Sequence, residues 1–508
     1  MVRLNEADHW RYAGRLDQHA TLGVQELRIS PSSAFKRPEV AKQCFQESTS
    51  CQTPLPLWDL NNSRSPEAIH LHHYLESCDW EALARKLKEL EGRNDSAEYE
   101  LVFSEENDAM ESPLHTAAWK CPDNLMMQML ELSPPDSRNT LLLRRDKMGN
   151  TVLHLCCANI DETVEFTVVK NVLLLAPEAL EMVNLKGDTP LHLLVNSPGF
   201  KKSHDFSVEL AAEEAIASLL SLAQENGTHQ NKMGLTLLHC AIANGAHERV
   251  LVQLLDLAPE AASIADAQGM LPLHYTAAFG GTPWTFVQQL IEVFPAALLA
   301  PTLQGDTPLH ILVANAQKQL NDDGLMNRNT SKIAELLVST PNGQLCPLLM
   351  PNKQRFFPLH CCAIFEAPLQ LTRILMGSPH ASAASIIPTH SGWTALHLAC
   401  TIASDKASVE NAKILCTQRA CTIFDASDRT PIMLLLEDSP VSSHLFKFLL
   451  NECPQSAALS TKKGYLPLHL ALEHGVKGSI VRRLVNVDRE TLSMTNYKGD
   501  TGRYQVTP

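Results

Sequence analysis

A short pattern of apolar and polar positions, close to Thr-Pro-Leu-His, returns along this chain about once every 36 residues. A constant period of this size predicts stacked helical units, each burying its apolar side against its neighbours. We call the last position of the pattern the anchor. In chain order the anchors are His115, His154, His192, His239, His274, His310, His360, His397, Met433 in place of histidine, and His469.

Within one unit the residues predict a turn, a helix, a second turn and a second helix. In the fifth unit, Asp266 and Gly269 predict a tight turn, since glycine permits a positive φ. Where the pattern begins with Thr-Pro, the threonine can cap the next helix and the proline fixes φ of its first residue. The leucine before the anchor is expected in the core, and small residues such as Ala277 let a neighbouring helix approach. A second helix is predicted over 282–293, ending at Pro295.

Two units are longer than the rest, by roughly 11 to 14 residues each. They lie between the third and fourth anchors and between the sixth and seventh. We assign the extra residues to 196–206 and 317–330, as loops between the two helices of their units. Long polar loops are often functional, but they are also the places where insertions are simply tolerated, so both interpretations stay open.

The start of the chain lacks the period. Residues 1–64 are expected to form a mostly disordered tail. A capping pair of helices is predicted over 65–91, because the second of these helices carries one apolar stripe and is otherwise charged. The stripe consists of Trp80, Leu83, Leu87 and Leu90.

These anchors resemble those of the ankyrin-repeat family, in a variant with a longer unit. The resemblance covers residues 65–508, as the capping pair, about ten anchored repeats over 111–494 and a terminal half-repeat over 495–508. It implies an all-α solenoid of antiparallel helix pairs with short hairpin turns between them. In this family partners usually bind the concave face formed by the turn tips and first helices, and the anchor histidine bridges the threonine hydroxyl and neighbouring backbone.

The chain departs from the family pattern in three ways. Its unit is about 36 residues rather than 33. Pro-Glu-Ala or Pro-Ala-Ala follows several second helices, at Pro177, Pro259 and Pro295, so a longer connection is expected there. Met433 replaces a histidine, so one repeat is expected to lose its polar bridge.

Either the chain is truncated within its final half-repeat, or that half-repeat covers the last helix pair.

Composition limits the partners and the compartment. The 508 residues include 42 basic and 56 acidic side chains, a net charge of −14, which argues against nucleic acid or an anionic membrane as the main partner. A local basic patch remains compatible with this average. No stretch reaches 18 apolar residues, and no signal peptide is recognisable. The 14 cysteines contain no Cys-x-x-Cys pair and are expected to be free thiols in the cytoplasm, with the nucleus as a second possibility.

Catalytic, metal and cofactor chemistry is not indicated. Neighbouring helices pack about 8–10 Å apart, so anchors of successive repeats cannot share one metal ion with ligand bonds of about 2 Å. The chain contains no phosphate-binding loop, dinucleotide-binding motif, zinc-protease motif or nucleophile elbow. We therefore expect neither an enzyme nor a bound cofactor or metal.

Large apolar side chains recur around the turns and give a hypothesis for a binding site. One row lies four residues before the anchors and a second four or five residues after them. We hypothesise that exposed members of these rows form a partner-binding face. The alternative is that they pack against adjacent hairpins and stiffen the array. The residues are Met270, Phe279, Phe356, Phe365, Trp393 and Tyr465.

The sequence therefore predicts a monomeric, non-catalytic scaffold or adaptor that binds a protein partner on the concave face of the array. The identity of that partner is not encoded in any motif. The alternative is a regulatory or recruiting subunit of an enzyme complex, acting through the N-terminal tail or the two insertions.

Overall fold

The computed structural model describes residues 66–93, 102–103, 106–107, 109–159, 167–197, 227–321, 324–339, 346–403, 405–437, 442–496 and 498–499. The predicted tail, most of the 196–206 insertion and most of the terminal half-repeat lie outside these ranges. Within them, regular structure consists of α-helices and short 3₁₀ turns, apart from isolated β-bridge residues such as the pair Leu320 and Met326. The described part of the chain is all-α, as predicted.

The described residues fall into two compact units, divided between Tyr275 and Thr276 inside helix α17 (Pro272–Phe279). The periodicity of the sequence continues through this point without interruption and did not predict a division. Each unit is described by itself below.

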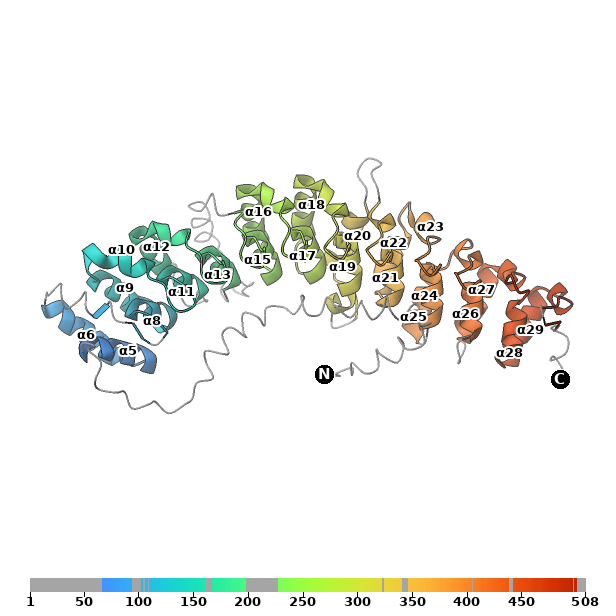
Figure 1. The fold of residues 1–508 in the computed structure, drawn as a ribbon, viewed down its shortest axis with the longest axis horizontal. Helices are drawn as coiled ribbons and strands as arrows, with labels where there is room; N and C mark the ends of the chain where they lie inside the picture. The colour runs from blue at the N-terminus through green and yellow to red at the C-terminus, as the bar shows by residue number, and fades with distance from the viewer. Residues whose placement is uncertain are drawn as a thin grey trace. The chain divides into compact units, whose positions relative to one another are not determined.

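In the 36–275 unit, the first helices of successive pairs contact one another, from α5 through α8, α11 and α13 to α15. The second helices α6, α9 and α12 form a neighbouring row in the same order (Figure 1). Apolar surface is therefore buried layer by layer between pairs that are adjacent in the chain. The bounds are α5 Pro66–Ser77, α6 Trp80–Arg93, α8 Pro113–Lys120, α9 Asp123–Leu132, α10 Pro135–Leu143, α11 Val152–Ala158, α12 Thr167–Leu175, α13 Pro190–Asn196, α15 Leu237–Asn244 and α16 Glu248–Leu257.

The unit from residue 276 onward repeats this arrangement. Its first helices α19, α21, α24, α26 and α28 contact one another in order, and the second helices α18, α20, α22, α25, α27 and α29 do the same. The bounds are α18 Trp284–Val293, α19 Pro308–Asn315, α20 Arg328–Val338, α21 Pro358–Ile364, α22 Leu369–Met376, α23 Ala381–Ala384, α24 Ala395–Ile402, α25 Lys406–Leu415, α26 Pro431–Glu437, α27 Ser443–Glu452, α28 Pro467–Glu473 and α29 Gly478–Val487.

The apolar residue before each anchor lies in the core, as the pattern predicted. This residue is buried in every repeat, including the one where isoleucine stands in its place. The set is Leu114, Leu153, Leu191, Leu238, Leu273, Leu309, Leu359, Leu396, Ile432 and Leu468. In the first helix pair, Leu83, Leu87 and Leu90 of the predicted stripe are buried and Trp80 is half-buried.

The longer connection expected after the second helices is a 3₁₀ turn that begins at the proline. It is found at Pro177–Leu180, Pro259–Ser263, Pro295–Leu299 and Pro454–Ala457. In each turn a buried alanine faces the core, for example Ala179 and Ala297. The extra residues of the unit are therefore ordered structure that adds apolar contact, because proline fixes φ at the start of the turn and alanine is small enough to pack.

The predicted 317–330 loop is partly folded. It lies between α19 and α20 as expected, but it contains a 3₁₀ turn at Ala316–Gln319 and its last residues already belong to α20. The side-chain amide of Gln319 donates to the carbonyl oxygens of Ala277 and Ala278, at 2.9 and 3.0 Å, which ties the insertion to the end of α17. The polar composition of this segment predicted a free loop. It could not reveal these hydrogen bonds, because they join residues more than 40 positions apart in the chain.

Candidate protein-binding site

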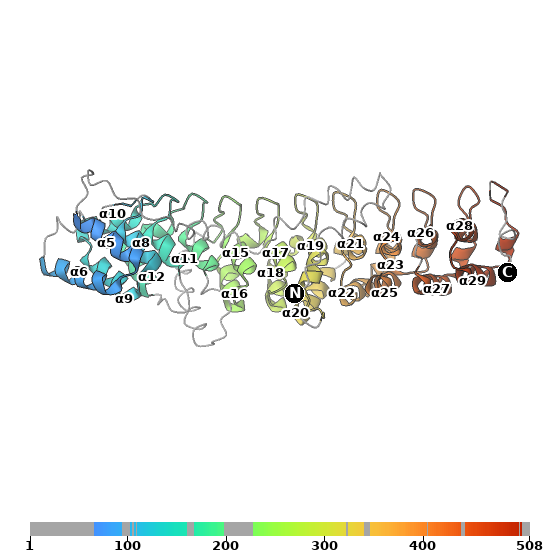
Figure 2. The ribbon, with the colours of Figure 1, turned by 90° about the horizontal axis from the view of Figure 1, so that it is seen from below.

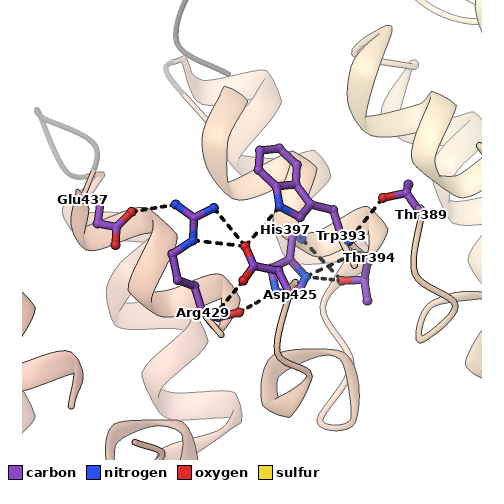
Figure 3. A network of polar contacts seen from close by, with 7 residues as sticks. All are labelled: Thr389, Trp393, Thr394, His397, Asp425, Arg429 and Glu437. Carbon is purple, nitrogen blue, oxygen red and sulfur yellow. Dashed lines mark hydrogen bonds and ion pairs between the residues drawn. The ribbon is translucent and has the colours of Figure 1, made fainter. Parts of the chain in front are cut away.

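Eight of the nine anchor histidines join two consecutive repeats, as His397 illustrates (Figure 3). Its Nδ1 accepts from the backbone N–H of Thr394 at 3.2 Å and lies 2.8 Å from the Thr394 hydroxyl. Because Nδ1 accepts a hydrogen bond from a backbone N–H, Nε2 of the neutral ring carries the hydrogen. Nε2 donates it to the carbonyl oxygen of Arg429, 3.2 Å away in the next hairpin. One imidazole therefore caps its own helix and holds the following turn.

The bridge recurs along both units with nearly the same geometry. The distance from Nε2 to a carbonyl oxygen of the next turn is 3.0 to 3.2 Å for His115, His154, His192, His239, His310, His360, His397 and His469. Where no hydroxyl precedes the anchor, the backbone N–H alone supplies the donor, as Phe357 does for His360 at 3.2 Å. These contacts match the role that the resemblance implied for the anchor.

Burial favours the neutral form of five of these imidazoles. It lowers the pKa to about 4 for His154, His192, His239, His360 and His397. With both ring nitrogens engaged and no access to water, these residues serve structure and are poorly suited to proton transfer. No group of three or more His, Cys, Asp or Glu side chains in the described ranges is arranged to hold a metal ion.

The structure corrects two members of the hypothetical partner-binding row. Met270 and Trp393 are only 5% and 7% exposed, so neither side chain is available to a partner. The Trp393 indole N–H donates to a carboxylate oxygen of Asp425 at 3.1 Å, and Arg429 forms an ion pair with that carboxylate at 3.0 Å (Figure 3). Arg429 in turn contacts Glu437 at 3.1 Å. Trp393 is buried because the next hairpin supplies a polar partner for its ring nitrogen, which supports the packing alternative.

The other four residues, Phe279, Phe356, Phe365 and Tyr465, are half-buried. The Phe356 ring lies edge-on to His360, with ring centroids 6.3 Å apart, and Tyr465 lies in the same way against His469 at 6.4 Å. These two rings therefore cover the anchor of their own repeat. The predicted row is mainly a set of packing contacts, which leaves little of it for a partner.

Large apolar side chains are exposed instead at the tips of the hairpins, one to three positions before the row that lies four residues ahead of the anchors. Met110, Met148, Leu185 and Met233 of the 36–275 unit are 49%, 51%, 56% and 61% exposed. Figure 2 shows that the hairpins of each unit project from one side of its helices. Met148, Leu185 and Met233 each belong to the pair of residues between Asp or Asn and glycine of a turn, and this pair was the signal in the sequence.

Backbone hydrogen bonds link consecutive tips of this unit into a ladder. The N–H of Lys147 donates to Ala109, that of Leu185 to Met148, and that of Lys232 to Lys186, each at 2.9 Å. The ladder fixes where the tip side chains emerge.

Glycine permits this close stacking. Gly149, Gly187 and Gly234 have φ of 77°, 77° and 78°, a conformation that strains other residues. A Cβ atom on Gly187 would lie 2.8 Å from the backbone nitrogen of Lys232, and one on Gly234 would lie 2.6 Å from that of Ala267. The tips are therefore held in close contact and present their exposed side chains from a fixed backbone.

Comparisons with known proteins add no assignment. No protein-family model matches the sequence, and no curated protein is similar enough to count as a match. Among solved structures, the chain is similar to one chain of the complex between the predatory endopeptidase Bd0816 from Bdellovibrio bacteriovorus and immunity protein Bd3460. The two share 17% identity and a TM-score of 0.30 over 42% of this chain and 95% of that one, a likeness too low to carry an argument about fold or function. None of the described helices is both long and apolar enough to cross a membrane.

Proposed function

We propose that this protein is a non-catalytic interaction scaffold, built as an ankyrin-type solenoid of helix pairs, that binds a protein partner along its hairpin edge. The observation that carries the proposal is the series of exposed apolar side chains at successive tips, from Met110 to Met233. Exposed apolar residues on a rigid support are what a protein interface needs, because ordering them on binding costs little entropy.

The use of the polar groups supports the same function. The anchor histidines are engaged in structural hydrogen bonds, and eight of them bond to a carbonyl oxygen of a neighbouring repeat, as His154, His239 and His360 do. An array assembled in this way offers an extended surface rather than a reaction centre. In the proposal the protein is a monomer of the cytoplasm or nucleus, since Cys156, Cys240 and Cys400, among others, are buried free thiols.

The experiment is capture of partners from a native extract by the full chain and by a Met148/Leu185/Met233→Ser variant. The matched control is Leu174/Leu257→Ser, because Leu174 and Leu257 are also exposed in this unit but lie on α12 and α16, away from the tips. Circular dichroism and thermal melting establish that the three proteins fold equally. Loss of a partner from the tip variant alone is the expected result. Equal capture by all three would contradict binding at the tips, and turnover of a substrate by the isolated chain would contradict a non-catalytic function.

A further inference from the structure

Two cysteines lie side by side in the connection that follows α25, in the unit from residue 276 onward (Figure 1). Cys416 caps the C-terminal end of α25, and Cys421 belongs to the 3₁₀ turn Ala420–Thr422. Both are free thiols, and their sulfur atoms are 3.4 Å apart. The sulfur atoms of a disulfide are about 2.05 Å apart. A small movement of this connection therefore suffices to bring the two sulfur atoms to bonding distance.

The two thiols differ in their access to solvent and in their acidity. Cys416 is half-buried, whereas Cys421 is buried. A hydrogen bond from the Cys421 thiol lowers the pKa of Cys416, although burial and the carboxylate of Glu452 act in the opposite direction, and the same contact raises the pKa of Cys421. The thiolate is the form that reacts with oxidants. A small oxidant from solvent therefore meets the reactive sulfur at Cys416, with a second thiol in contact behind it.

The segment 416–421 is held by the connections of both neighbouring repeats. On one side, the Thr417 hydroxyl lies 3.1 Å from the hydroxyl of Ser385, which follows α23. On the other side, the thiol of Cys453, which follows α27, donates to the carbonyl oxygen of Gln418 at 3.8 Å. A covalent change within this segment therefore acts at a joint between consecutive repeats.

We propose that Cys416 and Cys421 form an oxidative modification site, at which a hydroperoxide converts the two thiols into a reversible disulfide. The Cys416 thiolate attacks one peroxide oxygen, the O–O bond breaks, and the leaving hydroxide takes up the proton that Cys416 lost, which gives a sulfenic acid and water. The Cys421 sulfur then attacks the sulfenic sulfur. The S–S bond forms, the S–O bond breaks, and a second water leaves with the Cys421 proton. Two electrons pass from the thiols to the peroxide, and a dithiol reductant can return them.

The disulfide would close a short ring over residues 416–421 and hold the 3₁₀ turn. In this turn the N–H of Cys421 donates to Thr417 at 3.1 Å, and that of Thr422 donates to Arg419 at 3.2 Å. We expect both amide hydrogens to exchange with solvent at least about threefold more slowly in the oxidised chain. The site would then make one joint of the array responsive to oxidation, independently of any partner bound at the hairpin tips.

The test treats the reduced full chain with hydrogen peroxide and then unfolds it in the presence of iodoacetamide, which blocks the remaining thiols. Trypsin cleaves between the two cysteines at Arg419, so that Cys416 and Cys421 fall in peptides 414–419 and 420–429. The expected product is this pair of peptides joined by a disulfide, in the major fraction of the chain. The joined peptides should be absent after treatment with dithiothreitol.

Two variants of the full chain establish which thiols take part. Cys421→Ala removes the second thiol, so the sulfenic acid at Cys416 should persist and react with dimedone at least about fivefold more than in the unaltered chain. Cys453→Ala is the matched control, because Cys453 is also buried beside this connection. It should yield the joined peptides to the same extent as the unaltered chain. Thermal melting establishes that both variants fold.

Several outcomes would overturn the inference. One is the absence of the joined peptides from the unaltered chain after peroxide treatment. Another is a disulfide that joins peptide 420–429 to peptide 448–462, since Cys453 would then be the partner of Cys421. Equal dimedone labelling of Cys416 with and without Cys421 would show that the second thiol does not react with the sulfenic acid. Unchanged amide exchange at Cys421 and Thr422 after oxidation would contradict an effect on the joint.

Discussion

Thr430 and Met433 occupy the cap and anchor positions of α26, and the hydroxyl of Thr430 is buried without a hydrogen-bond partner among the described residues. In the preceding repeat the corresponding hydroxyl of Thr394 lies 2.8 Å from Nδ1 of His397. Met433 is fully buried and offers only a thioether near this position. The loss of a polar bridge that the sequence predicted at this repeat is thus confirmed.

Met433→His should stabilise the protein. The imidazole would accept from Thr430 and donate to the carbonyl of Tyr465 in the next hairpin, which together should add about 1–2 kcal/mol to the free energy of unfolding. Urea denaturation at pH 7.5 measures the change. Thr430→Val removes the unpaired hydroxyl without restoring the bridge, and should give a smaller gain. A variant less stable than the natural chain would show that the site cannot accommodate the ring.

Acid should destabilise the fold between about pH 6.5 and pH 4. Burial lowers the pKa of His154, His239 and His360 in the folded state to about 4, so the unfolded chain binds protons first as the pH falls. Each such histidine contributes a loss of about 1.4 kcal/mol per pH unit across this window, and nothing further below it. Urea denaturation at half-unit intervals measures the slope. The Met433→His variant should lose stability more steeply than the natural chain, whereas equal slopes would contradict this account.

Gly187→Ala should cost more stability than Gly245→Ala. Both glycines have positive φ, 77° and 72°, so alanine is strained at each by about 1–2 kcal/mol. Only at Gly187 would the added Cβ meet backbone, the nitrogen of Lys232 at 2.8 Å, whereas the space around Gly245 is open. Thermal melting of the two variants measures the difference. Equal destabilisation would mean that the hairpin tips can move apart without cost.

Leu309→Ala should lower the free energy of unfolding by about 2–5 kcal/mol, because it opens a cavity between stacked helices. Leu309 is 1% exposed, whereas Leu303, six residues earlier at a hairpin tip, is 54% exposed. Leu303→Ala is therefore the control and should change stability by less than about 0.5 kcal/mol. Chemical denaturation of both variants checks the register of the repeat. A cost below about 0.5 kcal/mol at Leu309 would contradict it.

Cys416 should react with iodoacetamide before Cys421. Their sulfur atoms lie 3.4 Å apart, and a hydrogen bond from the Cys421 thiol lowers the pKa of Cys416, while the same contact raises the pKa of Cys421. The thiolate, which is the reactive form, therefore forms at Cys416. Brief alkylation followed by peptide mass spectrometry measures the order. Cys421→Ala removes the donor and should slow alkylation of Cys416, and an unchanged rate would show that the hydrogen bond is unimportant.

Much of the fold could be predicted because its units are local and repeated. The anchor pattern identified the first helices, the buried leucines and the capping contact between Thr394 and His397, all of which lie within a few residues of each other. It also located the missing bridge at Met433. These features depend on helix geometry and hydrogen-bonding capacity, which the residue types themselves specify.

Exposure of the side chains around each turn was decided by the tertiary structure. Trp393 looked like an exposed groove residue, but its carbonyl accepts from His360 and its indole donates to Asp425, 33 and 32 residues away. The Met148 backbone likewise accepts from Leu185, which directs its side chain to solvent at the tip. By itself the sequence determined the helical repeat and its core, because those contacts recur with a fixed local pattern. Only the stacking of one hairpin on the next decided which apolar residues are buried and which remain for a partner.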